Sequence, residues 1–346
     1  MTRDHPTDDV EGTALVRETR EAAGVVARML ADPDRIAPLA AALAARPPRI
    51  AAICGRGSSG HAGVHLRYLL EAKLGIPVST TAPSVVTALD ARLDLAGALF
   101  VVISQSGRSP DLVAATRAAR AAGALTVALV NDDASPVAEA AERVLPIGAG
   151  PERSVAATKS VIGAMALGAL LVARVTGDTD LLAALARLPE RLERACGLDW
   201  SPAGEALAGA TAAFVTGRGY GFSAAREIAL KAMEVLRLPV LAYSAAELPH
   251  GPRAAVGART PVLALRVGDE TAAAVDALVG ALDAADLPPH LAGGPATRLP
   301  WIGDDHPVCD AIAFLAPAYM MIARTARAMG YDPDAPPHLE KVTETL

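Results

Sequence analysis

The chain has 346 residues, a formal net charge of −6, and 52% hydrophobic but only 3% aromatic residues. This length predicts two domains with large aliphatic cores, and the acidic balance argues against a nucleic-acid-binding surface. The three cysteines, Cys54, Cys196 and Cys309, have no metal-binding spacing, so we expect a reducing, cytoplasmic setting.

The N-terminal segment, "MTRDHPTDDVEG", is polar and acidic, unlike a signal peptide. Residues 11–45 have apolar residues at helical spacing and are predicted to be helices. Short β-branched runs then alternate with helical stretches: "RIAAIC" (49–54), "ALFVVIS" (98–104), "LTVALV" (125–130) and "RVLPI" (143–147). This alternation predicts an α/β fold with a parallel, doubly wound sheet.

The longest apolar run, "VIGAMALGALLVA" (161–173), is shorter than the ~20 residues that a membrane-spanning helix needs. It stops at Arg174. We therefore predict a buried helix and no membrane association.

The chain also contains an internal repeat. Residues 55–78, "GRGSSGHAGVHLRYLLEAKLGIPV", align without a gap with residues 217–240, "GRGYGFSAAREIALKAMEVLRLPV". Both copies follow an apolar run and end in Pro-Val, which favours two similar α/β units over chance similarity. The predicted organisation is N-terminal helices (1–48), a first domain (49–177), a linker helix with a second domain (178–330) and a C-terminal tail (331–346).

The first repeat contains Gly55-x-Gly57-x-x-Gly60, the spelling of a dinucleotide-binding turn. That site also needs an acidic residue about 20 residues further on for the ribose, and "GIPVSTTAPS" (75–84) has none. Backbone N–H groups at Gly57 and hydroxyls at Ser58 and Ser59 would instead suit a phosphate.

The following strand ends in a second polar loop, "SQSGRSPD", with Ser104, Gln105, Ser106 and Ser109. In an open α/β sheet, ligands bind at the carboxyl ends of the strands. Two neighbouring loops of neutral donors favour a phosphate ester of a polyol. The alternative is that these serines only cap helices.

The motifs "SQSGRSPD" and "GRGSSGHAG" resemble the sugar isomerase (SIS) domain family. Two tandem copies resemble the isomerase half of glucosamine-6-phosphate synthase and the stand-alone glucosamine-6-phosphate deaminases, over about residues 50–346. The resemblance implies two flavodoxin-like domains that bind a sugar phosphate through Ser59, Ser104, Gln105, Ser106 and Ser109. It also places Val155 and Ala157, in "AGPERSVAATKS" (149–160), near the sugar.

The second repeat replaces the serines with Glu227, Lys231 and Glu234, which share one helix face. Taken alone, these residues are typical of a solvated helix face with a weak Glu–Lys ion pair. The segment "GRGYGFSAAREIALKAMEVLRLPVLAYSAAELPHGP" resembles the synthase's isomerase site. That resemblance implies that Glu234 is the base moving a proton between C1 and C2, and that Lys231 positions it. It further implies that His250 of a partner subunit assists ring opening.

The tail "DAPPHLEKVTETL" resembles the family's ending, in which a lysine can form a Schiff base with the open-chain ketose. Lys341 takes that place. His61 and His65 are spaced i, i+4 but have no third ligand nearby, so no metal site is predicted. The implied chemistry requires no cofactor.

The short N-terminal segment leaves no room for the synthase's glutaminase domain, so we expect deamination of glucosamine 6-phosphate by a homodimer with a shared active site. Alternatives are a fructosamine-6-phosphate deglycase, another amino-sugar-phosphate isomerase, or a non-catalytic phosphosugar sensor. Arg108 and Pro110 depart from the synthase's acidic residue and alanine, which leaves the sugar-facing contacts open.

Overall fold

The computed structural model describes residues 10–341. These residues form two compact units, which are treated separately below. The first-sheet unit comprises residues 24–151 and 160–186, and the second-sheet unit comprises residues 10–23, 152–159 and 187–341. Residues 1–9 of the predicted N-terminal segment and residues 342–346 of the predicted tail lie outside the described residues.

The first-sheet unit contains a five-stranded parallel sheet with the order β2-β1-β3-β4-β5. Its central strands are buried along their whole length, because a parallel sheet is covered on both faces. The strands are β1 (Ala51–Cys54), β2 (Val78–Thr80), β3 (Leu99–Ser104), β4 (Leu125–Val130) and β5 (Arg143–Pro146).

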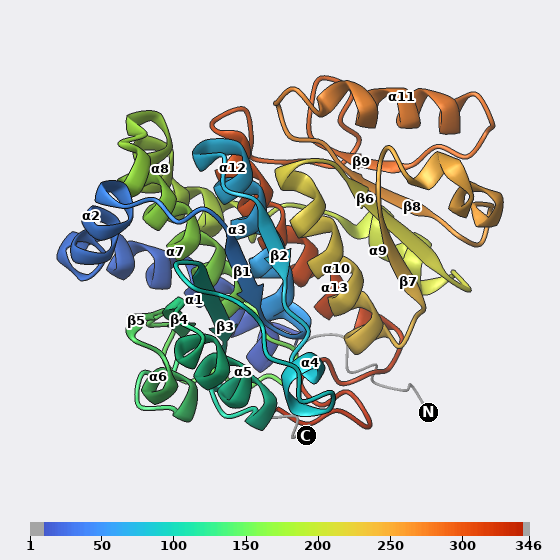
Figure 1. The fold of residues 1–346 in the computed structure, drawn as a ribbon. Coiled ribbons are helices and arrows are strands. Elements are labelled where there is room, and N and C mark those ends of the chain that lie inside the picture. Colours follow the sequence, from blue (N-terminus) through green and yellow to red (C-terminus); the bar gives the residue numbers. More distant parts are fainter. Residues whose placement is uncertain (1–9, 342–346) are drawn as a thin grey trace. The chain divides into compact units, whose positions relative to one another are not determined.

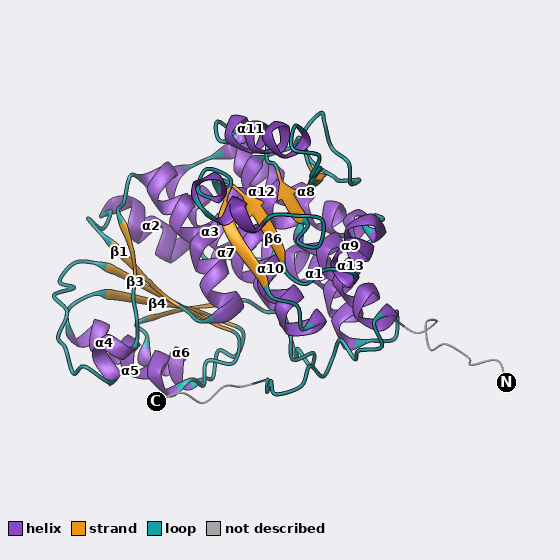
Figure 2. Ribbon diagram, turned by 90° about the vertical axis from the view of Figure 1, so that its right-hand side faces the viewer, coloured by secondary structure: helices purple, strands orange, loops and turns teal. Residues whose placement is uncertain are grey.

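Helices cover both faces of this sheet. Figure 2 shows α4, α5 and α6 together on one face, and α3 packs against β1 and β3 from the other. The helical elements are α2 (Ala37–Ala45), α3 (Gly57–Leu74), α4 (Ser84–Thr87), α5 (Pro110–Ala121), α6 (Pro136–Ala140) and the 3-10 turn η1 (Pro33–Arg35). The helices α1 (Ala14–Leu30), α7 (Lys159–Thr176) and α8 (Thr179–Ala195) contain residues of both units.

The second-sheet unit contains a four-stranded parallel sheet with the order β7-β6-β8-β9. This order repeats the first four positions of the other sheet, and β6 and β7 each begin 162 residues after β1 and β2. The strands are β6 (Ala213–Gly217), β7 (Val240–Ser244), β8 (Val262–Leu265) and β9 (His290–Ala292). The predicted repeat of two doubly wound α/β units is therefore confirmed.

Two groups of helices pack on this second sheet. The helix α10 packs against β6 and β7 and is backed by α12 and α13, whereas α11 joins the apolar core with β8 (Figure 1). The helical elements are α9 (Ser201–Ala208), α10 (Tyr220–Leu236), α11 (Ala272–Asp283), α12 (Pro307–Ala313), α13 (Leu315–Ala328) and the 3-10 turns η2 (Leu248–His250) and η3 (Pro252–Ala255).

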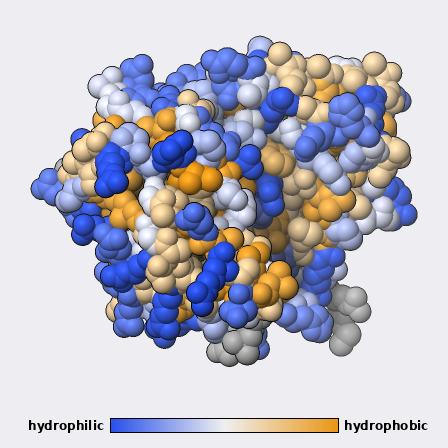
Figure 3. Space-filling view, in the orientation of Figure 1, coloured by the Kyte–Doolittle hydropathy of each residue, from blue (hydrophilic) through white to orange (hydrophobic). Residues whose placement is uncertain are grey.

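Two helical stretches, Lys159–Thr176 and Pro307–Ala328, are long and apolar enough to cross a membrane by composition alone. Both are mostly buried inside the protein, as core helices are, and the run 161–173 is a buried helix as predicted. On the surface in Figure 3, apolar residues are interspersed with polar ones.

Candidate functional site

The turn between β1 and α3 carries the first predicted loop. Gly57 opens α3 with a φ of 50°, a conformation that L side chains rarely adopt. Ser58 and Ser59 follow in the first turn of the helix, and both are partly exposed. Their hydroxyls thus stand at a helix N-terminus, where the first backbone N–H groups have no carbonyl partner within the helix.

The turn between β3 and α5 carries the second predicted loop. Ser104 ends β3, and its hydroxyl oxygen accepts a hydrogen bond from the Gly107 N–H at 3.0 Å. Gly107 has a φ of 64°, and a side chain there would collide with Ser135. The Ser106 hydroxyl accepts from the Arg108 N–H at 3.3 Å, and Ser109 precedes the helix without capping it through its side chain. The Ser109 hydroxyl therefore does not serve as the cap that the alternative interpretation required.

The two loops lie at the same edge of the first sheet, because β1 and β3 are neighbouring parallel strands. The Arg56 guanidinium pairs with the buried carboxylate of Asp111 at the start of α5, which ties one loop to the other. Arg108 pairs with Asp132 at 3.0 Å. Both arginines of these loops are thus paired with aspartates, so hydroxyl and N–H groups are the other donors that the loops contain.

In the second-sheet unit, α10 brings Glu227, Lys231 and Glu234 together. The Lys231 ammonium contacts Glu234 and lies 3.7 Å from the Glu227 carboxylate. Glu227 is 0% exposed and Lys231 is 1% exposed, so these residues do not form a solvated helix face. The Tyr319 hydroxyl of α13 donates to Glu227 at 3.0 Å.

Electrostatics explain why this cluster holds a charged lysine. Burial by itself would lower the pKa of Lys231, but the carboxylates of Glu227 and Glu234 outweigh it and raise that pKa. Burial, with Glu227 as a neighbour, raises the pKa of Tyr319 well above its ordinary value. Tyr319 therefore stays a neutral hydrogen-bond donor, and Lys231 stays a cation.

The two glutamates of the cluster differ in access. The Glu227 side chain is fully buried and bound to Tyr319, whereas 23% of the Glu234 side chain is exposed. A general base must reach the proton that it removes. Glu234 is the carboxylate of this pair that a substrate could reach.

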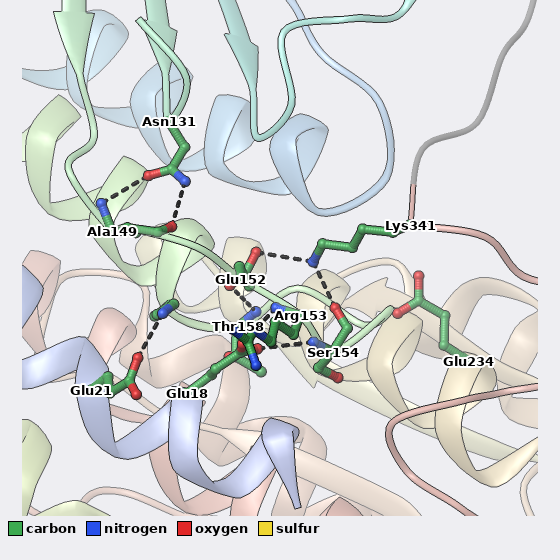
Figure 4. Close-up of polar contacts among 12 residues, drawn as sticks. Glu18, Glu21, Asn131, Ala149, Glu152, Arg153, Ser154, Thr158, Glu234 and Lys341 are labelled. Atoms are coloured by element: carbon green, nitrogen blue, oxygen red, sulfur yellow. Dashed lines mark hydrogen bonds and ion pairs between the residues drawn. The ribbon is translucent and has the colours of Figure 1, made fainter.

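The segment from Glu152 to Thr158 belongs to the same unit and meets the tail. Lys341 donates to the Ser154 carbonyl at 2.6 Å and to the Glu152 carboxylate at 3.3 Å. The other Glu152 oxygen accepts from the Thr158 N–H at 3.0 Å. In Figure 4 the Glu234 side chain points toward Ser154 and the Lys341 ammonium.

The remaining predicted site residues have fewer contacts with Glu234 and Lys341. Val155 and Ala157 lie in the same segment, and the Val155 N–H donates to the Asp334 carbonyl at 3.3 Å. His250 is exposed in η2. Among residues 10–341, the structure gives the His250 side chain no hydrogen bond or ion pair with Glu234.

Sequence reasoning missed Glu152, Tyr319 and the α1 residue Glu18, whose carboxylate binds the backbone of Arg153 and Ser154. Glu18 and Tyr319 are single polar residues outside the quoted motifs, and Glu152 lies in the segment 149–160, where only Val155 and Ala157 were singled out. One feature of the sequence could have pointed to these polar contacts: the chain has only four lysines among its 32 Lys and Arg residues. Three of the four, Lys159, Lys231 and Lys341, contact glutamates in this unit.

The cysteines and His65 are buried. Cys54, Cys196 and Cys309 are free thiols, and burial raises the pKa of Cys54 and Cys309 to about 12. Burial lowers the pKa of His65 to about 3, so this side chain is neutral in the folded protein.

Comparison with known proteins places this geometry in a family. The model of the SIS domain matches residues 46–174 and 206–288, which include the first sheet and strands β6, β7 and β8 of the second. The glutamine–fructose-6-phosphate aminotransferase (isomerizing) of Symbiobacterium thermophilum is 36% identical over 238 residues, covering 66% of this chain and 39% of the relative. The same enzyme of Methanothermobacter thermautotrophicus is 33% identical over 310 residues, covering 82% and 50%. The chain spans half or less of the length of these curated relatives.

Solved structures share the whole fold. A protein of Silicibacter pomeroyi DSS-3, assigned by its name to the phosphosugar isomerases, has a TM-score of 0.89 and 38% identity, covering 93% of this chain and 100% of that one. The glucosamine-6-phosphate deaminase of Thermotoga maritima has a TM-score of 0.77 at 21% identity, covering 96% and 98%, which shows the fold alone. With its two parallel-sheet units and the matched domain model, the chain belongs to the SIS domain family.

Proposed function

We propose that the protein is a phosphosugar aldose–ketose isomerase that also releases an amino group. Its reaction would convert glucosamine 6-phosphate and water into fructose 6-phosphate and ammonia. The observation that carries this proposal is the accessible carboxylate of Glu234 beside the buried, charged Lys231. The curated relatives are named for amino transfer to fructose 6-phosphate, which supports the same class of substrate.

The phosphate is assigned to the two loops of the first-sheet unit. Ser59, Ser104, Gln105, Ser106 and Ser109 would donate to its oxygens, together with the N–H groups that follow Gly57. Hydroxyl and amide donors bind a phosphate without a buried cation, and the pairing of Arg56 and Arg108 with aspartates is consistent with that mode. Ser109 has a hydroxyl not engaged in capping, which supports its role here.

The proton transfer is assigned to Glu234. After ring opening, Glu234 would remove the proton from C2 of the open-chain aldose and return it to C1. The C2 amine gives up one N–H proton and becomes an imine, and the C1 aldehyde takes up that proton on its oxygen and becomes a hydroxymethyl group. Lys231 would position Glu234 for the transfer, because its ammonium contacts that carboxylate.

Release of ammonia is assigned to Lys341. The Lys341 amine would add to C2 of the imine, and ammonia would leave as the lysine takes its place. Water then hydrolyses the new imine, which frees fructose 6-phosphate and restores the lysine. Contact of Lys341 with the segment that carries Val155 and Ala157 supports this role. We propose that His250 serves ring opening in a homodimer, in the site of the partner copy.

A specific observation keeps a second substrate open. Arg108, in the second loop, is held by Asp132 where the synthase has an acidic residue of its own. A changed charge there could suit fructosamine 6-phosphate, so a deglycase is the second candidate.

Ammonia release across phosphorylated amino sugars tests the proposal. We expect turnover of glucosamine 6-phosphate and none of glucosamine, because the two loops of the first-sheet unit would bind the substrate through its phosphate. Turnover of fructosamine 6-phosphate alone would favour the deglycase.

The variant Glu234→Gln tests the assigned base. It should lower kcat by about 10²- to 10⁴-fold, the usual contribution of a general base. The matched control is Glu190→Gln, which changes an exposed carboxylate of α8. Full turnover by Glu234→Gln would reject the assigned base, and binding without turnover of any substrate would favour a phosphosugar sensor.

A further inference from the structure

The N-terminal helix α1 contributes a buried carboxylate to the segment that meets Lys341. Glu18 is 2% exposed, and its two oxygens accept from the Arg153 N–H at 2.5 Å and the Ser154 N–H at 3.1 Å (Figure 4). A buried carboxylate is costly unless its oxygens are hydrogen-bonded. The two N–H groups satisfy Glu18 and, in turn, fix the backbone at residues 153–154.

The peptide group that follows Ser154 is held by the C-terminal tail on both sides. Its carbonyl accepts from the Lys341 ammonium at 2.6 Å, and its N–H, at Val155, donates to the Asp334 carbonyl at 3.3 Å. Lys341 also contacts Glu152, two residues before Ser154. The position of the Lys341 amine therefore depends on how this short segment is oriented.

The tail is tied back to α1 at a second point. The Asp334 carboxylate accepts from the Ala14 N–H at 2.7 Å and the Leu15 N–H at 2.8 Å. Both N–H groups belong to the first turn of the helix, where they have no carbonyl partner within the helix itself. Glu18 lies one turn further along the same helix. Helix α1 thus holds the tail through Asp334 and the 153–154 backbone through Glu18.

We propose that Glu18 is a positioning residue for Lys341. Through the 153–154 backbone it would set where the Ser154 carbonyl and Glu152 hold the lysine amine. This inference deepens the proposed function and rests on the assigned role of Lys341 in ammonia release. Glu18 touches no reacting atom in that scheme and acts only through the segment.

The test measures the reactivity of the Lys341 amine directly, by limited acylation followed by mass spectrometry of each lysine. In Glu18→Gln, an amide NH₂ replaces one acceptor oxygen, so one backbone N–H loses its partner. We expect Lys341 to be acylated about threefold faster or more, because a lost hydrogen bond to a charged group loosens the segment. Lys73, which pairs with Asp178 in the first-sheet unit, is the internal control and should not change.

Two further variants keep the test decisive. Glu18→Asp keeps both acceptor oxygens and should partly restore the slow acylation. Asp334→Asn weakens the second tie of α1 and should change Lys341 in the same direction as Glu18→Gln. These variants carry the test if Glu18→Gln does not fold.

A merely structural role makes a different prediction. The variant Asp310→Asn removes a buried carboxylate of the same unit that pairs with Arg191, and serves as the stability control. If Glu18→Gln loses stability as Asp310→Asn does while Lys341 is acylated at the wild-type rate, the inference is overturned. A fall in kcat with little change in KM, beyond that of Asp310→Asn, would support it.

The inference and the proposed function fail separately. Faster acylation of Lys341 in a protein that releases no ammonia would retain the positioning and reject the function. If the protein is an active deaminase but Glu18→Gln leaves the acylation rate of Lys341 unchanged, the function is retained and the positioning role of Glu18 is rejected.

Discussion

The Tyr319 hydroxyl donates to the Glu227 carboxylate over 3.0 Å, and both side chains are fully buried. This bond gives Glu227 a neutral partner besides Lys231, and the lysine also contacts Glu234. The helix α10 therefore holds one carboxylate, Glu227, that stabilises the buried cluster and one, Glu234, that a substrate could reach.

The variant Tyr319→Phe should separate these roles. It removes the donor and leaves a buried acceptor, which should cost about 1–3 kcal/mol of the free energy of unfolding. Urea denaturation measures that loss. Because Glu234 and Lys231 remain, turnover should fall far less than in Glu234→Gln. An unchanged unfolding free energy would mean that the hydroxyl is not buried against Glu227.

The variant Lys231→Met should be more damaging. It leaves Glu227 buried without its cation, and breaking a buried ion pair from one side costs about 3–5 kcal/mol. The double variant Lys231→Met with Glu227→Gln should recover part of this loss, because the orphaned charge is gone. Denaturation of the two single variants and the double variant completes the cycle. Simple additivity of the two losses would contradict the pairing.

Acid should destabilise the protein through His65. Its folded pKa of about 3 lies below the unfolded value of about 6.5, so the unfolded state binds more protons as the pH falls below 6.5. Stability should therefore fall from pH 6.5 downward, by roughly 2 kcal/mol at pH 5 from this group alone.

The variant His65→Gln checks this origin. The difference in unfolding free energy between pH 7 and pH 5 should shrink in the variant by that amount, since the other titrating groups are common to both proteins. Denaturation at the two pH values measures it. An equal pH dependence in both proteins would show that His65 is not buried in the neutral form.

Removal of the Ser109 hydroxyl should weaken substrate binding. A hydrogen bond to a charged group contributes about 1.5–3 kcal/mol, so Ser109→Ala should raise KM for the phosphorylated sugar by roughly tenfold or more. The change in kcat should be smaller, because the phosphate is remote from C1 and C2. Steady-state kinetics measure both constants. The control is Ser84→Ala, in the short helix α4.

The sequence was sufficient to predict the fold because its signals are local and repeated. Gly-Arg-Gly followed by a helix and Pro-Val marks the β1-α3-β2 and β6-α10-β7 units in both sheets. The position of the two serine loops also follows from strand order, since β1 and β3 are neighbours in a doubly wound sheet.

The polar contacts of the second-sheet unit could not be predicted in this way. Tyr319 and Glu227 are 92 residues apart, and Lys341 and Ser154 are 187 apart, so no local pattern links either pair. The burial of Lys231 was also hidden, because Glu227, Lys231 and Glu234 have the spacing of an ordinary solvated helix face. Only tertiary packing distinguishes the two cases.

The tie between Asp334 and the first turn of α1 joins residues 320 and 319 positions apart in the chain. Contacts of such sequence separation form late, because the entropy of closing the intervening loop must be overcome first. During synthesis, α1 leaves the ribosome long before Asp334 and Lys341 do. The first turn of α1 can therefore gain the Asp334 carboxylate, and the Ser154 carbonyl can gain Lys341, only long after Glu18 has met the 153–154 backbone.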